Sequence, residues 1–158
     1  MIKLKIEQDT GHLLSFYHVY DEQGETLFVI ESKFELGAHL FVRDPDGECL
    51  AEIKRRLPSV LPVYELTIGG EQAGRITKRV GISSYKAEPI GWETKGDIFG
   101  LQYNVKCGGE LVLAVNKPIS AFGDTYDLKI YDEQNVMMAV LMTVVFDISQ
   151  HRGDGTEQ

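Results

Sequence analysis

The residues best suited to chemistry in this sequence are basic side chains that gather in its middle third. The chain of 158 residues has a formal net charge of −8, yet residues 53–95 hold eight basic and four acidic side chains, a local net charge of +4. Residues 1–52 and 96–158 carry −7 and −5. An anion would therefore be attracted to the middle third. The overall negative charge argues against nucleic acid as a partner, because its binding depends on a basic surface.

Five basic residues in and beside this stretch would converge if neighbouring strands placed them side by side. They are Lys33, Arg55, Arg56, Lys78 and Arg79. Several converging cations could hold a phosphorylated head group, since arginine forks bind phosphate in bidentate fashion. We predict an anion-binding site at these residues. The alternative, in which they only solvate the outer wall of a sheet, stays open.

The other chemistry-bearing residues form no pattern typical of catalysis or metal binding. His12, His18, His39 and His151 lack the spacing of a zinc site. The sequence contains neither a Gly-x-Ser-x-Gly elbow nor a phosphate loop ending in Gly-Lys. We therefore expect no catalytic residues, no metal and no cofactor, and we predict that the chain is not an enzyme.

Several single features have a functional and a structural interpretation. The segment 44–48 resembles a calcium loop but lacks alternating oxygen ligands and a distant bidentate glutamate, so we predict a solvated turn. Asp147 is either a perturbed functional carboxylate or, as we expect, a satisfied or exposed one. Trp92 and Tyr126 are predicted to pack rather than to stack on a ligand.

The two cysteines, Cys49 and Cys107, fit neither a disulfide framework nor a metal site. Because each lies beside apolar residues, we predict buried free thiols, which are typical of a reducing cytoplasm. Residues 1–7 alternate apolar and charged side chains, which indicates a strand and not a signal peptide.

A weak internal repeat indicates the architecture. Gly24, Gly47, Gly70 and Gly109 lie in turn-like contexts, and each is followed six residues later by an apolar residue and two or three further on by a basic one. The apolar residues are Ile30, Ile53, Ile76 and Val115. Glycine allows the positive φ of tight turns, and the runs that follow suit a half-buried pleated surface. About twelve short strands are predicted between Ile2 and Tyr131, at the spacing of a barrel or sandwich.

The segment 136–146 changes the pattern, because it contains eleven residues with a single hydroxyl among them. As a helix it would have no polar face and would need burial on all sides. A membrane span takes about 20 apolar residues, so we expect no transmembrane segment. A strand is the other alternative, although an eleven-residue strand would be long and Met-Met-Ala favours a helix.

We therefore predict a mainly β fold, a closed antiparallel barrel of about twelve strands that encloses a hydrophobic C-terminal helix. Residues 1–150 would form one domain with the helix at about 132–150, and residues 151–158 a polar tail.

Four stretches resemble the LURP-one-related family, whose fold is shared with the C-terminal domain of tubby proteins and with phospholipid scramblases. They are the segments 30–37, 53–64, 91–97 and, most specifically, 123–126 followed by the apolar segment and Asp147. The resemblance spans roughly residues 15–150 and implies a twelve-stranded barrel around a central helix. It is less informative about activity: tubby domains bind phosphoinositides through basic surface residues, whereas many LURP-one-related proteins have no assigned biochemistry. The scramblase activity is not implied, because a Pro/Cys-rich N-terminal region is missing.

We expect a cytoplasmic, non-enzymatic domain that binds an anionic membrane surface or another phosphorylated ligand through the five basic residues. The alternative is an intracellular protein-interaction or scaffold domain with no small ligand, which would expose an apolar patch.

Overall fold

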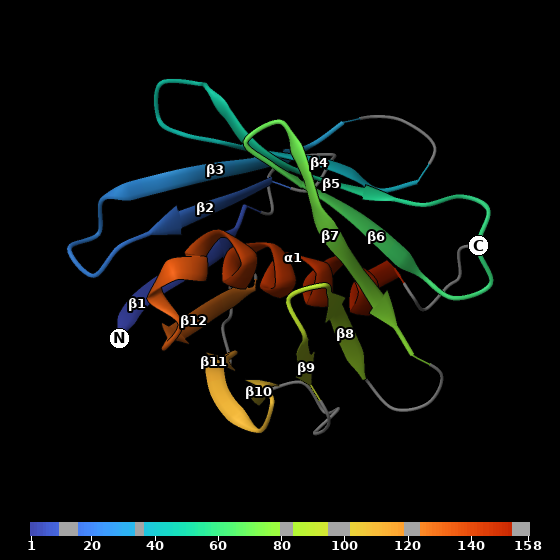
Figure 1. Ribbon diagram of the computed structural model, residues 1–158. Coiled ribbons are helices and arrows are strands. Elements are labelled where there is room, and N and C mark those ends of the chain that lie inside the picture. The colour runs from blue at the N-terminus through green and yellow to red at the C-terminus, as the bar shows by residue number, and fades with distance from the viewer. Residues whose placement is uncertain (10–15, 34–36, 80–83, 95–101, 119–123, 153–158) are drawn as a thin grey trace.

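The computed structural model describes residues 1–9, 16–33, 37–79, 84–94, 102–118 and 124–152. Twelve antiparallel strands close into a barrel around one helix, as Figure 1 shows. The strands are β1 (Ile2–Gln8), β2 (Phe16–Tyr20), β3 (Thr26–Ser32), β4 (His39–Arg43), β5 (Cys49–Arg55), β6 (Val63–Ile68), β7 (Glu71–Lys78), β8 (Tyr85–Glu88), β9 (Trp92–Thr94), β10 (Gln102–Cys107), β11 (Glu110–Asn116) and β12 (Thr125–Ile130). The predicted fold class is confirmed.

Barrel closure depends on the strand that comes first in the chain. Each strand pairs with its neighbours in sequence, and β1 additionally pairs with β12, from Ile2 opposite Ile130 to Glu7 opposite Thr125. Odd-numbered strands therefore run in one direction and even-numbered strands in the other. The barrel has a hairpin end, formed by the turns at 21–25, 44–48, 69–71, 89–91 and 108–110 and by residues 131–135. At its loop end the odd-numbered strands end and the even-numbered strands begin.

The turns after β2 and β4 share one geometry. In each, an aspartate carboxylate accepts two backbone amide hydrogen bonds of 2.9 Å, at Asp21 and at Asp44. Gly24 and Gly47 complete the turns with φ of 83° and 93°, which explains the predicted glycines. The segment 44–48 is thus a hairpin turn, as predicted. In the described residues no group of three or more His, Cys, Asp or Glu is arranged to hold a metal ion.

The helix α1 (Val136–Arg152) runs through the barrel from the hairpin end to the loop end (Figure 1). A 3₁₀ turn, Glu133–Asn135, precedes it, so the regular helix begins four residues later than the predicted 132 and ends two residues later. The side chain of Asp132 accepts a 2.8 Å bond from the Asn135 side chain and caps no backbone amide. The strand alternative for 136–146 is wrong.

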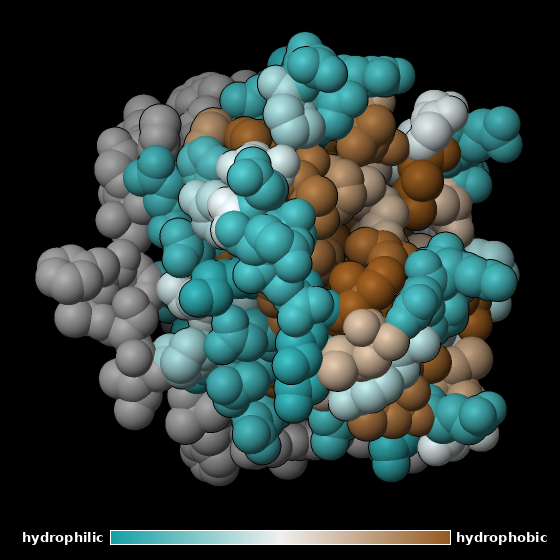
Figure 2. Space-filling model, turned by 90° about the vertical axis from the view of Figure 1, so that its left-hand side faces the viewer, coloured by the Kyte–Doolittle hydropathy of each residue, from teal (hydrophilic) through white to brown (hydrophobic). Residues whose placement is uncertain are grey.

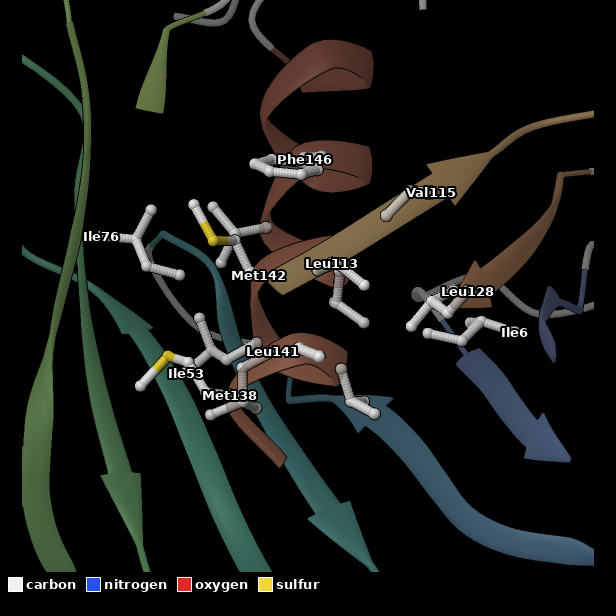
Figure 3. Close-up of a cluster of buried hydrophobic side chains, with 14 of the residues drawn as sticks. Ile6, Ile53, Ile76, Leu113, Val115, Leu128, Met138, Leu141, Met142 and Phe146 are labelled. Atoms are coloured by element: carbon white, nitrogen blue, oxygen red, sulfur yellow. The ribbon is translucent and has the colours of Figure 1, made fainter. Parts of the chain in front are cut away.

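Residues 138–149 of α1 are buried on every side, and the closed sheet supplies the apolar partners (Figure 3). The residues six positions after the turn glycines all belong to this core: Ile30, Ile53, Ile76 and Val115. The hydroxyl of Thr143 is satisfied by the carbonyl of Ala139 at 2.9 Å. Burial of about ten large side chains, at roughly 1.5–3 kcal/mol each, makes the helix the main core element.

The prediction of buried cysteines is wrong for Cys49, which is exposed at the start of β5. It is partly right for Cys107, which is half-buried. Both thiols are free. Trp92 is fully buried and packs in the core, as predicted. Among the described helices, none combines the length and apolar character needed to cross a bilayer.

Candidate functional site

The five predicted basic residues all lie at the loop end of the barrel. Lys33 follows β3, Arg55 and Arg56 lie where β5 ends, and Lys78 and Arg79 lie where β7 ends. Strand β6 separates β5 from β7, with backbone bonds from Arg56 to Val63 and from Lys78 to Pro62 of 2.8 and 3.0 Å. At a strand spacing of about 4.8 Å, the ends of β5 and β7 are roughly 10 Å apart.

Two of these cations occupy inward-facing positions at the mouth of the barrel. Arg55 lies opposite the buried Tyr64 and continues the inward row of Ile53. Lys78 lies opposite the buried Tyr85 in the same way. Because side chains alternate between the faces of a strand, Arg55 and Lys78 face the barrel axis, and both are half-buried.

The inward cations have no anionic partner among the described residues. The Nε of Arg55 is shielded from solvent and makes no hydrogen bond. Neither Arg55 nor Lys78 forms an ion pair with the part of the chain that is described, and the same holds for the exposed Lys33. A buried donor without a partner is costly unless a ligand or water satisfies it.

Arg56 and Arg79 lie on the outer wall, where glutamates of nearby strands neutralise them. Arg56 pairs with Glu65 of β6, and Arg79 pairs with Glu93 of β9 at 3.4 Å. The structure therefore brings the five residues to one end but divides them between two faces. Arg55 and Lys78 form the core of the candidate site, with Lys33 on the rim.

The loop between β5 and β6 adds apolar side chains to the same end. Leu57 is 46% exposed and Val60 is fully exposed, at 100%. These are the two large hydrophobic residues that the described part of the loop end presents to solvent. The segment Arg55–Pro62 thus combines basic residues with exposed apolar side chains.

Beneath the mouth lies a ring of tyrosines that sequence reasoning missed as a set. Tyr17, Tyr64, Tyr85, Tyr103 and Tyr126 each occupy the first or second position of an even-numbered strand. That recurrent position, just after a loop, was the available signal. The hydroxyls of Tyr85 and Tyr103 bond Ser149 and Gln150 near the helix C-terminus, at 2.7 and 2.9 Å.

Asp147 lies inside this tyrosine ring and is 1% exposed. Tyr17 and Tyr126 each donate a hydrogen bond to one of its two carboxylate oxygens. Burial, together with the neighbouring Asp147 carboxylate, raises the pKa of Tyr126. The expected interpretation of Asp147 as a satisfied carboxylate is confirmed, and Tyr126 packs rather than stacking on a ligand.

The tyrosine ring makes stability sensitive to alkaline pH. Burial raises the pKa of Tyr85 to about 12, whereas an unfolded tyrosine ionises near 10. The stabilisation from neutral Tyr85 is complete below pH 10 and is lost as pH rises from 10 to 12, by up to about 3 kcal/mol. Urea titrations between pH 8 and 11.5 should show the free energy of unfolding falling above pH 10. The Tyr85→Phe variant should fall less steeply, and equal slopes would contradict this account.

The family follows from comparison with known proteins. A family model described as LURP-one-related matches residues 2–147. The chain belongs to the LURP-one-related family. This LURP-one-related chain is 31% identical over 151 residues to the uncharacterized protein YxjI of Bacillus subtilis, covering 94% of this chain and 93% of the relative. An X-ray structure of a protein from Arabidopsis thaliana shares the fold, with a TM-score of 0.64 and 13% identity. The match covers 96% of this chain and 92% of the Arabidopsis chain.

The predicted family is thereby confirmed for this LURP-one-related chain. Some residues on which predictions rested lie outside the described part of the structure. They are His12, the tail after Arg152, and parts of the segments 30–37, 91–97 and 123–126.

Proposed function

We propose that this LURP-one-related barrel is a cytoplasmic, non-enzymatic binding domain that docks its loop end on an anionic membrane surface. One observation carries the proposal. The fully exposed Val60 belongs to the loop that begins directly after two strand-end cations, and one of these, Arg55, has no anionic partner among the described residues. Apolar side chains that enter the interface and cations that meet phosphate head groups act together in such docking.

The distribution of charge supports this orientation despite the net charge of −8. The hairpin-end segments hold ten Asp or Glu and no Lys or Arg, counted over 21–25, 44–48, 69–71, 89–91, 108–110 and 131–135. At the opposite end, Arg55 and Lys78 are the last residues of β5 and β7, and Lys33 follows β3. A negatively charged surface therefore attracts the loop end and repels the hairpin end.

The proposed binding surface does not use the interior polar groups near the helix C-terminus. Asp147, Ser149 and Gln150 bond tyrosine hydroxyls of the surrounding strands. These contacts use the carboxylate and the hydroxyl within the core, where a substrate has no access. The described residues around the helix C-terminus thus stabilise the barrel.

The membrane proposal is tested with the double variant Arg55→Gln/Lys78→Gln. Each basic residue near an anionic surface contributes about 1 kcal/mol, so the loss of both should weaken binding roughly 30-fold. Flotation with vesicles of phosphatidylcholine and phosphatidylserine measures the partition coefficient at low and physiological salt. The Val60→Ser variant should weaken binding as well, whereas soluble inositol phosphates should bind Val60→Ser like the unchanged protein.

The matched control is Arg75→Gln/Lys86→Gln, which removes the same charge from outer-wall residues that pair with Glu88. This control should float like the unchanged protein. The C-terminus of α1 carries partial negative charge, which cations also stabilise. If Arg55→Gln/Lys78→Gln lowered the melting temperature and left flotation unchanged, the two cations would serve the helix, and the membrane proposal would be wrong.

A further inference from the structure

The hairpin end of the barrel carries an apolar hollow that neither the core nor the proposed membrane site uses. It has a volume of about 340 Å³ and lies between the β6–β7 turn, the β8–β9 turn and the first turn of α1. Its apolar lining is formed by Ile68, Ala73, Pro89, Ile90, Met137 and Met138. Figure 2 views this side of the molecule and shows hydrophobic side chains gathered in a hollowed area with hydrophilic ones beside them.

The hollow lies where the helix enters the barrel, and Gln134 and Asn135 of the 3₁₀ turn line it beside the apolar residues. Four of its lining residues, Ile68, Ala73, Ile90 and Met137, are only partly buried, although they pack against the core. Their partial exposure leaves apolar surface that an incoming side chain can bury. Methionines adapt their shape to an incoming side chain, and two of them line the hollow.

The surroundings of the hollow are acidic. Glu71 begins β7 directly after the turn that follows Ile68, and Glu133 precedes Gln134 and Asn135, which line the hollow from the 3₁₀ turn. Both glutamates are exposed. Glu133 forms an ion pair with the N-terminal amino group of Met1, whereas Glu71 forms no ion pair with the described residues. The other turns at this end add further carboxylates and no Lys or Arg. A cationic segment is attracted by this field, and an anionic bilayer is repelled.

We infer that the hollow binds a basic peptide segment of a protein partner through one or two large apolar side chains. The volume lies at the small end of ligand sites, about 300–1,000 Å³, which suits a side-chain anchor better than a cofactor. The apolar anchor supplies affinity by burial, and flanking Lys or Arg of the partner fix its orientation over Glu71. This site is independent of the proposed membrane site, because it lies at the opposite end of the barrel.

The inference is tested with a fluorescein-labelled peptide of sequence RKGLFGKR and the full chain, by fluorescence anisotropy. The unchanged protein should bind in a saturable, salt-weakened manner. Ala73→Phe fills the hollow, and Met137→Lys places a cation in it, so each should weaken binding at least tenfold. Glu71→Lys should weaken binding several-fold. Far-UV circular dichroism and melting curves establish that each variant is folded. Ala73→Phe changes β7 and Met137→Lys changes α1, so the two variants test the hollow independently.

Two controls separate the charge at the hollow from net charge and from the membrane site. Glu7→Lys makes the same charge change on the exposed face of β1, where the residue lies opposite His18, and should bind the peptide normally. Arg55→Gln/Lys78→Gln should also bind it normally. Equal affinity of the folded Ala73→Phe or Met137→Lys variant would overturn the inference. Concentration-dependent self-association that Ala73→Phe abolishes would overturn it too, because the occupant would then be a second copy.

Discussion

Replacing Phe146 by alanine is expected to lower the free energy of unfolding by about 3–5 kcal/mol. The ring is fully buried in the C-terminal half of α1, where it contacts Tyr85 and Tyr103 with centroid distances of 4.7 and 4.9 Å. The substitution removes the apolar burial and both ring contacts and leaves a cavity that the closed barrel cannot collapse to fill. Equilibrium urea unfolding monitored by circular dichroism measures the loss.

The control for this experiment is Tyr131→Ala. Tyr131 is 43% exposed just beyond β12, so its removal should change the free energy of unfolding by less than about 0.5 kcal/mol. If Phe146→Ala cost no more than Tyr131→Ala, the helix would not be the main core element. The interpretation of the barrel as a container for α1 would then be wrong.

Replacing Asp147 by leucine is expected to lower the free energy of unfolding by about 2–6 kcal/mol. The carboxylate accepts hydrogen bonds from Tyr17 and Tyr126, and its removal leaves two buried hydroxyls without that partner. Each unsatisfied buried hydroxyl costs about 1–3 kcal/mol. The measurement is again urea unfolding at pH 7, where the tyrosines are neutral.

A combined variant distinguishes lost hydrogen bonds from a simple misfit of leucine. In Asp147→Leu/Tyr17→Phe/Tyr126→Phe neither tyrosine hydroxyl remains, so much of the stability lost in Asp147→Leu should return. If Tyr17→Phe and Tyr126→Phe each lowered the stability of Asp147→Leu further, and the two losses added, the tyrosine hydroxyls would have other partners. The result would revise the account of the tyrosine ring, while the barrel topology would stand.

The fold was predictable because two local patterns required the same container. A segment with no polar face, 136–146, must be enclosed, and the turn glycines with apolar residues six positions later describe short strands that can enclose it. Strand count and closure followed from these requirements. Ile53 and Ile76 are buried in the structure, so the repeat correctly indicated inward-facing residues of their strands.

The candidate site was predictable only in part, since a one-residue step at a strand end reverses the direction of a side chain. Arg55 and Arg56 are adjacent in sequence, yet Arg55 faces the barrel mouth and Arg56 faces Glu65 on the outer wall. The distinction needs the exact register of β5 with β6. Cys49 was mispredicted for a different reason: it is the first residue of β5, beside the turn and at a register shift with β4, and there it is exposed.

The pairing of β1 with β12 has a consequence for the synthesis of this protein on the ribosome. Ile2 and Ile130 are partners, so the wall cannot be completed until nearly every strand has left the exit tunnel. The helix emerges later still, and until then the inner faces of the twelve strands have no helix to surround. Contacts between such distant residues form slowly, and unpaired strand edges invite aggregation in the meantime. We therefore expect newly made chains to depend on chaperones more strongly than their length suggests.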